Sequence, residues 1–303
     1  MSDASLPPSS GKLRTFGARL FSTVILLGIL VAVVCWGNVW GYRGVVGILC
    51  MLTAWEWGDM LRKSGKPSQP WLATVFGMAY PLAMVGLLGY WELKAPGALR
   101  NLPSVQDKLL PLMVGAPVLL IVMSFIWEMR RVIIGSRPLR SVAVTVLSFI
   151  YPVWMFSFAF LLTGSERLCI VLLLLILLTK ASDIFAYVSG LLLGGRFVKR
   201  KLIPHISPKK TWEGLIGSYL LTMGAGVAVA IYFGGFTWQV LPGMTLLFLL
   251  AVTGDLAGSL IKRSLALKDS SAMLPGIGGF FDLIDSMAFT LSCVCVWLMM
   301  SGI

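Results

Sequence analysis

The stretch LLLLILLTKASDIFAYVSGLLLGGRFVKRK, Leu172 to Lys201, decides the fold class of this 303-residue chain. Its apolar run belongs to a segment, 167–194, that is long enough to cross a bilayer as an α-helix. Lys180 and Asp183 interrupt the run and, being three residues apart, share a helix face and can pair. Tyr187, one turn further on, lies on the same face. Charges within a membrane helix point by default to a functional site, and a structural ion pair between helices is the alternative.

The whole chain has the composition of a membrane protein. Apolar residues make up 57% and charged residues 13%, with a mean hydropathy of +0.88, whereas soluble proteins average about 25% charged residues. We therefore predict an all-α, polytopic integral membrane protein with an uncleaved first span. About nine transmembrane helices are expected near residues 18–38, 42–61, 71–91, 109–128, 140–163, 167–194, 213–233, 237–261 and 280–301.

The basic residues are distributed unevenly between the predicted loops. The N-terminal segment and the loops after spans two, four, six and eight carry 19 of the 25 Lys and Arg residues. The positive-inside rule then predicts a cytoplasmic N-terminus and an external C-terminus. Most of the formal net charge of +12 would then lie on the cytoplasmic surface, which would suit anionic lipids or a phosphate-rich substrate. Binding to nucleic acid is not needed to explain this charge. Five cysteines without a C-x-x-C motif indicate neither a disulfide framework nor a zinc site.

A second polar segment, HISPKKTWEG, follows the sixth span at residues 205–214. Ser207 before Pro208 is typical of a helix N-cap with proline at the first helical position, so we predict that the seventh helix starts there. Lys209 and Lys210 would then oppose the helix dipole unless an anion such as phosphate binds. The alternative is that these lysines only anchor the helix at the cytoplasmic interface.

A third polar segment, GDLAGSLIKRSLALKDSSAMLPGIGGFFDLIDS, joins spans eight and nine at residues 254–286. Asp282 and Asp285 share a helix face, and a helix N-terminus by itself favours one such acid. With Asp255 they form an oxygen-rich set of the kind that Mg²⁺ prefers, and the neighbouring basic residues suggest metal-assisted chemistry on phosphates. The loop contains glycines that would let the backbone approach a ligand closely, namely Gly276, Gly278 and Gly279.

Three segments resemble, in the expected order, motifs of the phosphatidate cytidylyltransferases, also called CDP-diacylglycerol synthases. They are SDIFAYVSG, SPKKTWEG and the stretch 254–286, and together they cover about 180–286, whereas the first 165 residues are similar only in being several membrane spans. The resemblance implies the reaction CTP + phosphatidate → CDP-diacylglycerol + pyrophosphate. It also implies Mg²⁺ and a site on the cytoplasmic side of a bacterial inner membrane. Whether the protein forms a homodimer is left open.

The resemblance and the spacing together define a candidate site. Asp255, Asp282 and Asp285 are expected to be both catalytic residues and ligands of Mg²⁺, and a second cation is left open. Lys262 and Arg263 are the other expected catalytic residues. We divide the chain into N-terminal spans one to five, 1–165, and catalytic spans six to nine, 166–303. The candidate substrate-binding residues are Asp183, Tyr187, Ser207, Lys209, Lys210, Ser259, Lys268, Asp269, Gly276, Gly278 and Gly279.

The chain departs from the family pattern at two positions. Ile277 stands where the family's loop has a histidine, and Leu283 where an arginine is common. Loss of the histidine need not stop the reaction, because a phosphate monoester with a second pKa of about 6 is already largely dianionic and needs no general base. The barrier is repulsion between two anions, which metal ions and lysines relieve.

Two other activities stay open at this point. A CTP-dependent lipid kinase, of the polyprenol type, would use the same metal and nucleotide groups but transfer the γ-phosphoryl group. An ion-coupled transporter would also bury acids and a lysine in broken helices. The charged residues of this chain gather at one membrane face instead of lining a path through the bilayer, which disfavours the transporter.

Overall fold

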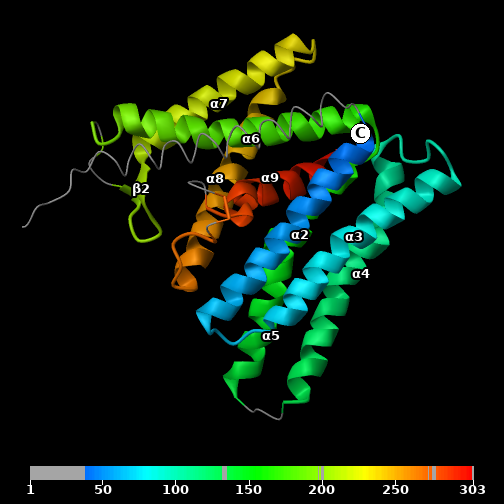
Figure 1. Cartoon of the computed structure of the whole chain (residues 1–303). Helices are drawn as coiled ribbons and strands as arrows, with labels where there is room; N and C mark the ends of the chain where they lie inside the picture. Colours follow the sequence, from blue (N-terminus) through cyan, green and yellow to red (C-terminus); the bar gives the residue numbers. More distant parts are fainter. Residues whose placement is uncertain are drawn as a thin grey trace, which may run out of the picture.

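The computed structural model describes residues 38–131, 135–196, 198, 201–271, 273–274 and 278–301. Eight helical segments within these residues are long and apolar enough to cross a membrane, which confirms an all-α, polytopic membrane protein. The predicted first span, 18–38, lies outside the described residues apart from Asn38. The elements in Figure 1 are α2 (Val39–Ser64), α3 (Pro70–Lys94), α4 (Leu102–Met129), α5 (Ser136–Phe149), η1 (Ile150–Trp154), η2 (Phe156–Thr163), α6 (Glu166–Leu193), β1 (Lys201–Ile203), β2 (Ser207–Thr211), α7 (Trp212–Tyr232), α8 (Val240–Ser264) and α9 (Phe280–Ser301).

The fifth span is a broken helix. The α-helix α5 gives way to the π-helical turn η1 and then to the 3₁₀-helix η2. Pro152 lies in η1, and a proline inside a helix removes one backbone hydrogen bond and clashes with the preceding turn, which explains the break. The break also places Tyr151 in the core, where it contacts α8 and α9.

The seventh helix starts later than the sequence predicts. Residues 207–211 form strand β2, which pairs antiparallel with β1, and α7 begins only at Trp212. The N-cap is Thr211, whose side-chain oxygen accepts a hydrogen bond from the backbone N–H of Gly214 at 3.1 Å. The predicted start at Ser207 is wrong, because the backbone of that segment pairs with β1. Lys210 therefore belongs to a strand instead of a first helical turn.

The hydrophobic core is continuous from the N-terminal spans to α6 and α9. It joins side chains such as Leu88 of α3, Phe160 of η2, Leu172 of α6 and Ile284 of α9. The helix α6 packs along α7, and α8 packs along α9, as Figure 1 shows. Large apolar side chains such as Leu220 stay exposed on the outer helix faces, as expected where lipid replaces water.

Candidate functional site

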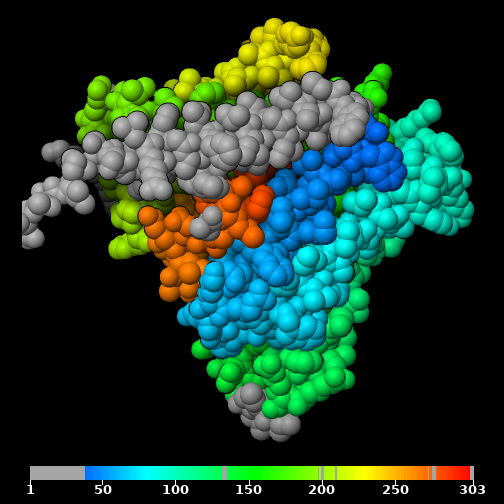
Figure 2. All heavy atoms as spheres, in the orientation of Figure 1, coloured from blue at the N-terminus to red at the C-terminus, as the bar shows by residue number. Residues whose placement is uncertain are grey.

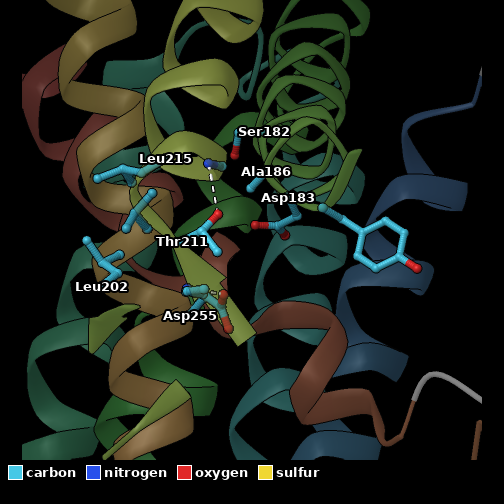
Figure 3. Close-up of a pocket in the computed structure, with 11 residues that line it drawn as sticks. Ser182, Asp183, Ala186, Leu202, Thr211, Leu215 and Asp255 are labelled. Carbon is cyan, nitrogen blue, oxygen red and sulfur yellow. Dashed lines mark hydrogen bonds and ion pairs between the residues drawn. The ribbon is translucent and has the colours of Figure 1, made fainter. Parts of the chain in front are cut away.

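A cavity of about 210 Å³ lies between α6, α7, α8 and the β1–β2 hairpin (Figure 3). Asp183 and Asp255 line it together with Lys210, and its apolar lining includes Leu202 and Leu215. In Figure 3 the carboxylate of Asp183 points towards the middle of the cavity, and the two leucines lie together on the other side. The cavity can therefore accept a molecule with both a charged and an apolar part.

The hairpin is tied to α8 by an ion pair at this cavity. The ammonium Nζ of Lys210, in β2, lies 2.5 Å from Oδ2 of Asp255, in α8. Both side chains are partly exposed, so the pair borders the cavity instead of lying in the core. Lys210 is thus positioned where a phosphate could compete with Asp255 for it.

A second charged group links α6 to α9. Lys180 pairs with Asp183 at 3.2 Å, as the sequence predicts, and its Nζ also donates to Oγ of Ser286 at 2.9 Å. The same hydroxyl of Ser286 donates to Oδ2 of Asp183 at 3.1 Å. Because all three groups contact one another, the intramembrane charges of α6 are held by the start of α9.

A third group is buried between α8 and α9. Lys262 forms an ion pair with Asp282, and its Nζ lies 3.9 Å from Oδ2 of Asp285. The structure thus confirms that the two acids of α9 share a face. Asp282 also accepts a hydrogen bond from the backbone N–H of Gly279 at 3.0 Å, and its Oδ2 lies 2.7 Å from Oγ of Ser270. Asp282 therefore fixes the loop before α9 as well as its first turn.

Two glycines of α8 allow this close contact with α9. A Cβ atom on Gly254 would lie 2.7 Å from the carbonyl oxygen of Asp285, and one on Gly258 would lie 2.9 Å from Cβ of Asp285. This spacing is the small-xxx-small pattern of closely packed membrane helices. The hydroxyl of Tyr151 donates to the carbonyl of Gly254 at 2.7 Å and so supports the same contact from the fifth span.

Glu56 of α2 also contacts this region, and it is not among the site residues predicted from the sequence. Like Lys180, it is a charged residue inside an apolar span, and that signal could have identified it from the sequence. It is 1% exposed and contacts the loop before α9. A Cβ atom on Gly279 would overlap the carboxylate of Glu56, and one on Gly278 that of Asp282. These two glycines therefore make room for acids of this chain, and the closer approach to a ligand predicted for them stays a prediction.

The other candidate residues are less involved in these clusters. Arg263, Lys268 and Asp269 are exposed at the end of α8 and in the turn that follows, outside the three charged groups. Ser207 begins β2, and Ser259 is half-buried on α8. The side chain of Lys209 and the residues Gly276 and Ile277 lie outside what the structure describes. Leu283, where the family commonly has arginine, packs against the hydrophobic core.

The acids of the site fit a hard divalent cation by their chemistry, because carboxylate oxygens are the ligands that Mg²⁺ prefers. Asp183 and Asp255 line the same cavity, and Asp285 precedes Ser286, whose hydroxyl donates to Asp183 at 3.1 Å. In the described part of the chain, however, no three His, Cys, Asp or Glu side chains converge closely enough to hold a metal ion. Lysines occupy the intervening positions, and a cation would have to replace those contacts. The metal roles of Asp255, Asp282 and Asp285 stay predictions.

Similarity to known proteins covers most of the chain. The profile of the cytidylyltransferase family matches residues 17–301. A phosphatidate cytidylyltransferase of Mycobacterium leprae is 36% identical over 169 residues, which are 55% of this chain and 52% of that protein. One of Mycobacterium bovis is 37% identical over 122 residues, 40% of this chain and 38% of that protein. An uncharacterized protein of Escherichia coli, YnbB, is 34% identical over 148 residues, 48% of each chain.

The chain spans about half the length, or less, of the curated relatives that it matches. The family profile, in contrast, extends over nearly all of its residues, from the predicted first span to the end of α9. This protein belongs to the cytidylyltransferase family.

Proposed function

We propose that this protein transfers the cytidylyl group of CTP to phosphatidate and releases CDP-diacylglycerol and pyrophosphate. The observation that carries the proposal is the convergence of the three motif-like segments on one site. Asp183 of α6, Lys210 of β2 and Asp255 of α8 line one cavity, and α9 adjoins it through Ser286, whose hydroxyl donates to Asp183 at 3.1 Å. The names of curated relatives support the same activity.

In the proposed reaction a phosphate oxygen of phosphatidate attacks the α-phosphorus of CTP. The bond from that phosphorus to the bridging oxygen breaks, and its electron pair leaves with pyrophosphate. Lys210 and Lys262 reduce the repulsion between the two anions and hold them in line. Asp255, Asp282 and Asp285 would hold Mg²⁺, which when bound would neutralise phosphate charge. The apolar side of the cavity would accept the start of the acyl chains.

The membrane placement follows from the same proposal. CTP is soluble and phosphatidate is a lipid, so the site must be open to both water and bilayer. We place the ends of α6 and α8 and the start of α9 on the cytoplasmic side of a bacterial inner membrane, because the basic loops lie at that end. The basic surface would also attract anionic lipids.

A labelling experiment tests the reaction directly. Purified protein in detergent with phosphatidate and Mg²⁺ should move label from the α-phosphate of CTP into lipid, and label from the γ-phosphate into pyrophosphate. Chelation of Mg²⁺ should stop both transfers. Label from the γ-phosphate in lipid would instead show a lipid kinase. Absence of nucleotide turnover together with solute flux across vesicles would show a transporter.

A further inference from the structure

We propose that Glu56 is a positioning residue that fixes the start of α9 and so directs Asp282 and Asp285 towards the substrates. The inference rests on the proposed function for its kinetic consequences and on the structure for its contacts. Glu56 belongs to α2, more than 200 residues before the segment that it contacts. Figure 1 shows α2 and α9 side by side, and Figure 2 shows the α2 surface adjoining the residues that follow α8.

Both carboxylate oxygens of Glu56 are used to hold this segment. Oε2 accepts the backbone N–H of Phe281 at 2.7 Å, and Oε1 accepts the hydroxyl of Ser270 at 2.7 Å. The N–H of Phe281 belongs to the first turn of α9, where backbone donors have no partner within the helix. Gly279 precedes the helix and has no side chain to act as a cap. Glu56 therefore supplies, from another helix, the acceptor that a local cap would normally provide.

Ser270 extends the contact from Glu56 to the charged cluster. Its hydroxyl lies 2.7 Å from Oε1 of Glu56 and 2.7 Å from Oδ2 of Asp282, so the two carboxylates share its one proton. Its backbone N–H donates to the same oxygen of Asp282 at 3.2 Å. Asp282 in turn pairs with Lys262. Glu56, a buried acid of the N-terminal half, is thus connected through Ser270 and Asp282 to Lys262, the lysine proposed to bind substrate phosphate.

Trp57, the next residue after Glu56, packs against the side chain of Phe281. The ring of Trp57 contacts the ring of Phe281 edge to face, with centroids 5.1 Å apart and planes at 86°. Trp57 is 2% exposed and Phe281 is fully buried. Two consecutive residues of α2 therefore bind the backbone and the side chain of Phe281. This double contact leaves α9 little freedom to turn about its axis, and that rotation would move Asp282 and Asp285 together.

The test compares a variant that keeps the contacts with one that removes them. In Glu56→Gln the amide oxygen can still accept the Phe281 N–H, and the amide nitrogen can donate to Ser270. Glu56→Ala loses both bonds. We expect Glu56→Ala to lower kcat by about 10- to 10²-fold with KM changed by less than about threefold, because a misplacement of about 1 Å has effects of this size. Glu56→Gln should keep most of the wild-type kcat.

A control variant and a hydrogen-exchange measurement show whether the effect is particular to Glu56. Asp59→Asn removes an acid of the same helix that forms an i,i+4 surface pair with Lys63, and it should leave kcat unchanged. Hydrogen exchange of the backbone amides in 279–283 should be faster in Glu56→Ala and unchanged in Glu56→Gln. Should Glu56→Ala not fold, Ser270→Ala, which keeps the Phe281 bond, should give a smaller loss of kcat in the same direction.

The proposal is overturned if Glu56→Ala keeps wild-type kcat, or if its amide exchange in 279–283 is unchanged. Equal loss of kcat in Glu56→Gln and Glu56→Ala would also overturn it, because the charge and not the contact would then matter. If the wild-type protein makes no CDP-diacylglycerol, the proposed function fails, whereas the exchange measurement still decides whether Glu56 fixes the start of α9.

Discussion

At the residue scale, three lysines of the site pair with its four aspartates. Asp183, Asp255 and Asp282 each pair with a different lysine, and Asp285 lies beside the last of these. Each lysine is therefore held close to an acid at a partly or fully buried position. Phosphate groups and a cation would exchange these partners instead of adding unpaired charge, which keeps the desolvation cost of binding low.

Asp282→Asn tests the role of the most extensively bonded acid. The variant keeps the size of the side chain but removes a charge that pairs with Lys262 and that we expect to act on the metal. We expect turnover to fall by at least about 10²-fold, since one such electrostatic interaction is typically worth about 3 kcal/mol. Membrane insertion should be retained, because a neutral amide does not oppose it. Initial rates across a Mg²⁺ titration measure the effect, and a fully active, normally Mg²⁺-dependent variant would contradict the metal role.

At the element scale, the site depends on two contacts between elements. The helices α8 and α9 approach closely at Gly254 and Gly258, and the β1–β2 hairpin closes one side of the cavity through Lys210. The first contact sets the separation of the acids on facing helices. The second decides where α7 begins, because β2 ends at the cap residue Thr211.

Gly258→Ala should disturb the α8–α9 contact. The added Cβ would lie 2.9 Å from Cβ and 3.0 Å from Oδ2 of Asp285, so the helices must separate or Asp285 must move. We expect a loss of stability of about 1–3 kcal/mol, typical of overpacking, and a fall in turnover. Gly243→Ala is the matched control in the same helix, because its Cβ would meet no atom within 4 Å. Thermal unfolding in detergent compares the two, and equal behaviour would argue against the contact.

Thr211→Ala should reveal where α7 begins. Removing the side-chain oxygen leaves the N–H of Gly214 without its cap and should cost about 1 kcal/mol of stability. Thr211→Ser should retain most of that energy. Ser207→Ala, at the start predicted from sequence, should have little effect on unfolding. If Ser207→Ala lowered the unfolding temperature more than Thr211→Ala, the helix would start where the sequence predicts.

At the scale of the whole molecule, the N-terminal and C-terminal spans share one hydrophobic core. The core continues across residue 165, and α9 packs against α2 and η2 of the N-terminal part. The acids of α9 are therefore held partly by spans whose sequence has no recognised motif. This arrangement explains why an N-terminal residue such as Glu56 can affect the site.

The orientation in the membrane is testable with single cysteines in a chain whose native cysteines are replaced. Ser207→Cys lies in β2, at the end of the molecule that carries the basic loops, and should be labelled only from the cytoplasmic side. Ala95→Cys lies exposed after α3, at a predicted external loop, and should be labelled only from outside. Membrane-impermeant reagents on intact cells and on inverted vesicles measure both, and the reverse pattern would overturn the predicted orientation.

The sequence by itself determines the features that depend on local spacing. Apolar runs must form helices in a bilayer because each backbone group needs a partner within the segment, so eight predicted spans are found in the described residues. The Lys180–Asp183 pair and the shared face of Asp282 and Asp285 follow from helical periodicity. Lys180 and Asp183 pair within one helix, and Asp282 and Asp285 face the same lysine from one helix.

Only the tertiary structure decides the contacts between residues far apart in the chain. The Lys210–Asp255 pair depends on the hairpin, which also moves the start of α7 to Trp212. Glu56 meets Phe281 across 225 positions. Helix periodicity specifies which face a residue occupies but not which helix that face will meet, because that choice is made by the packing of all the spans together.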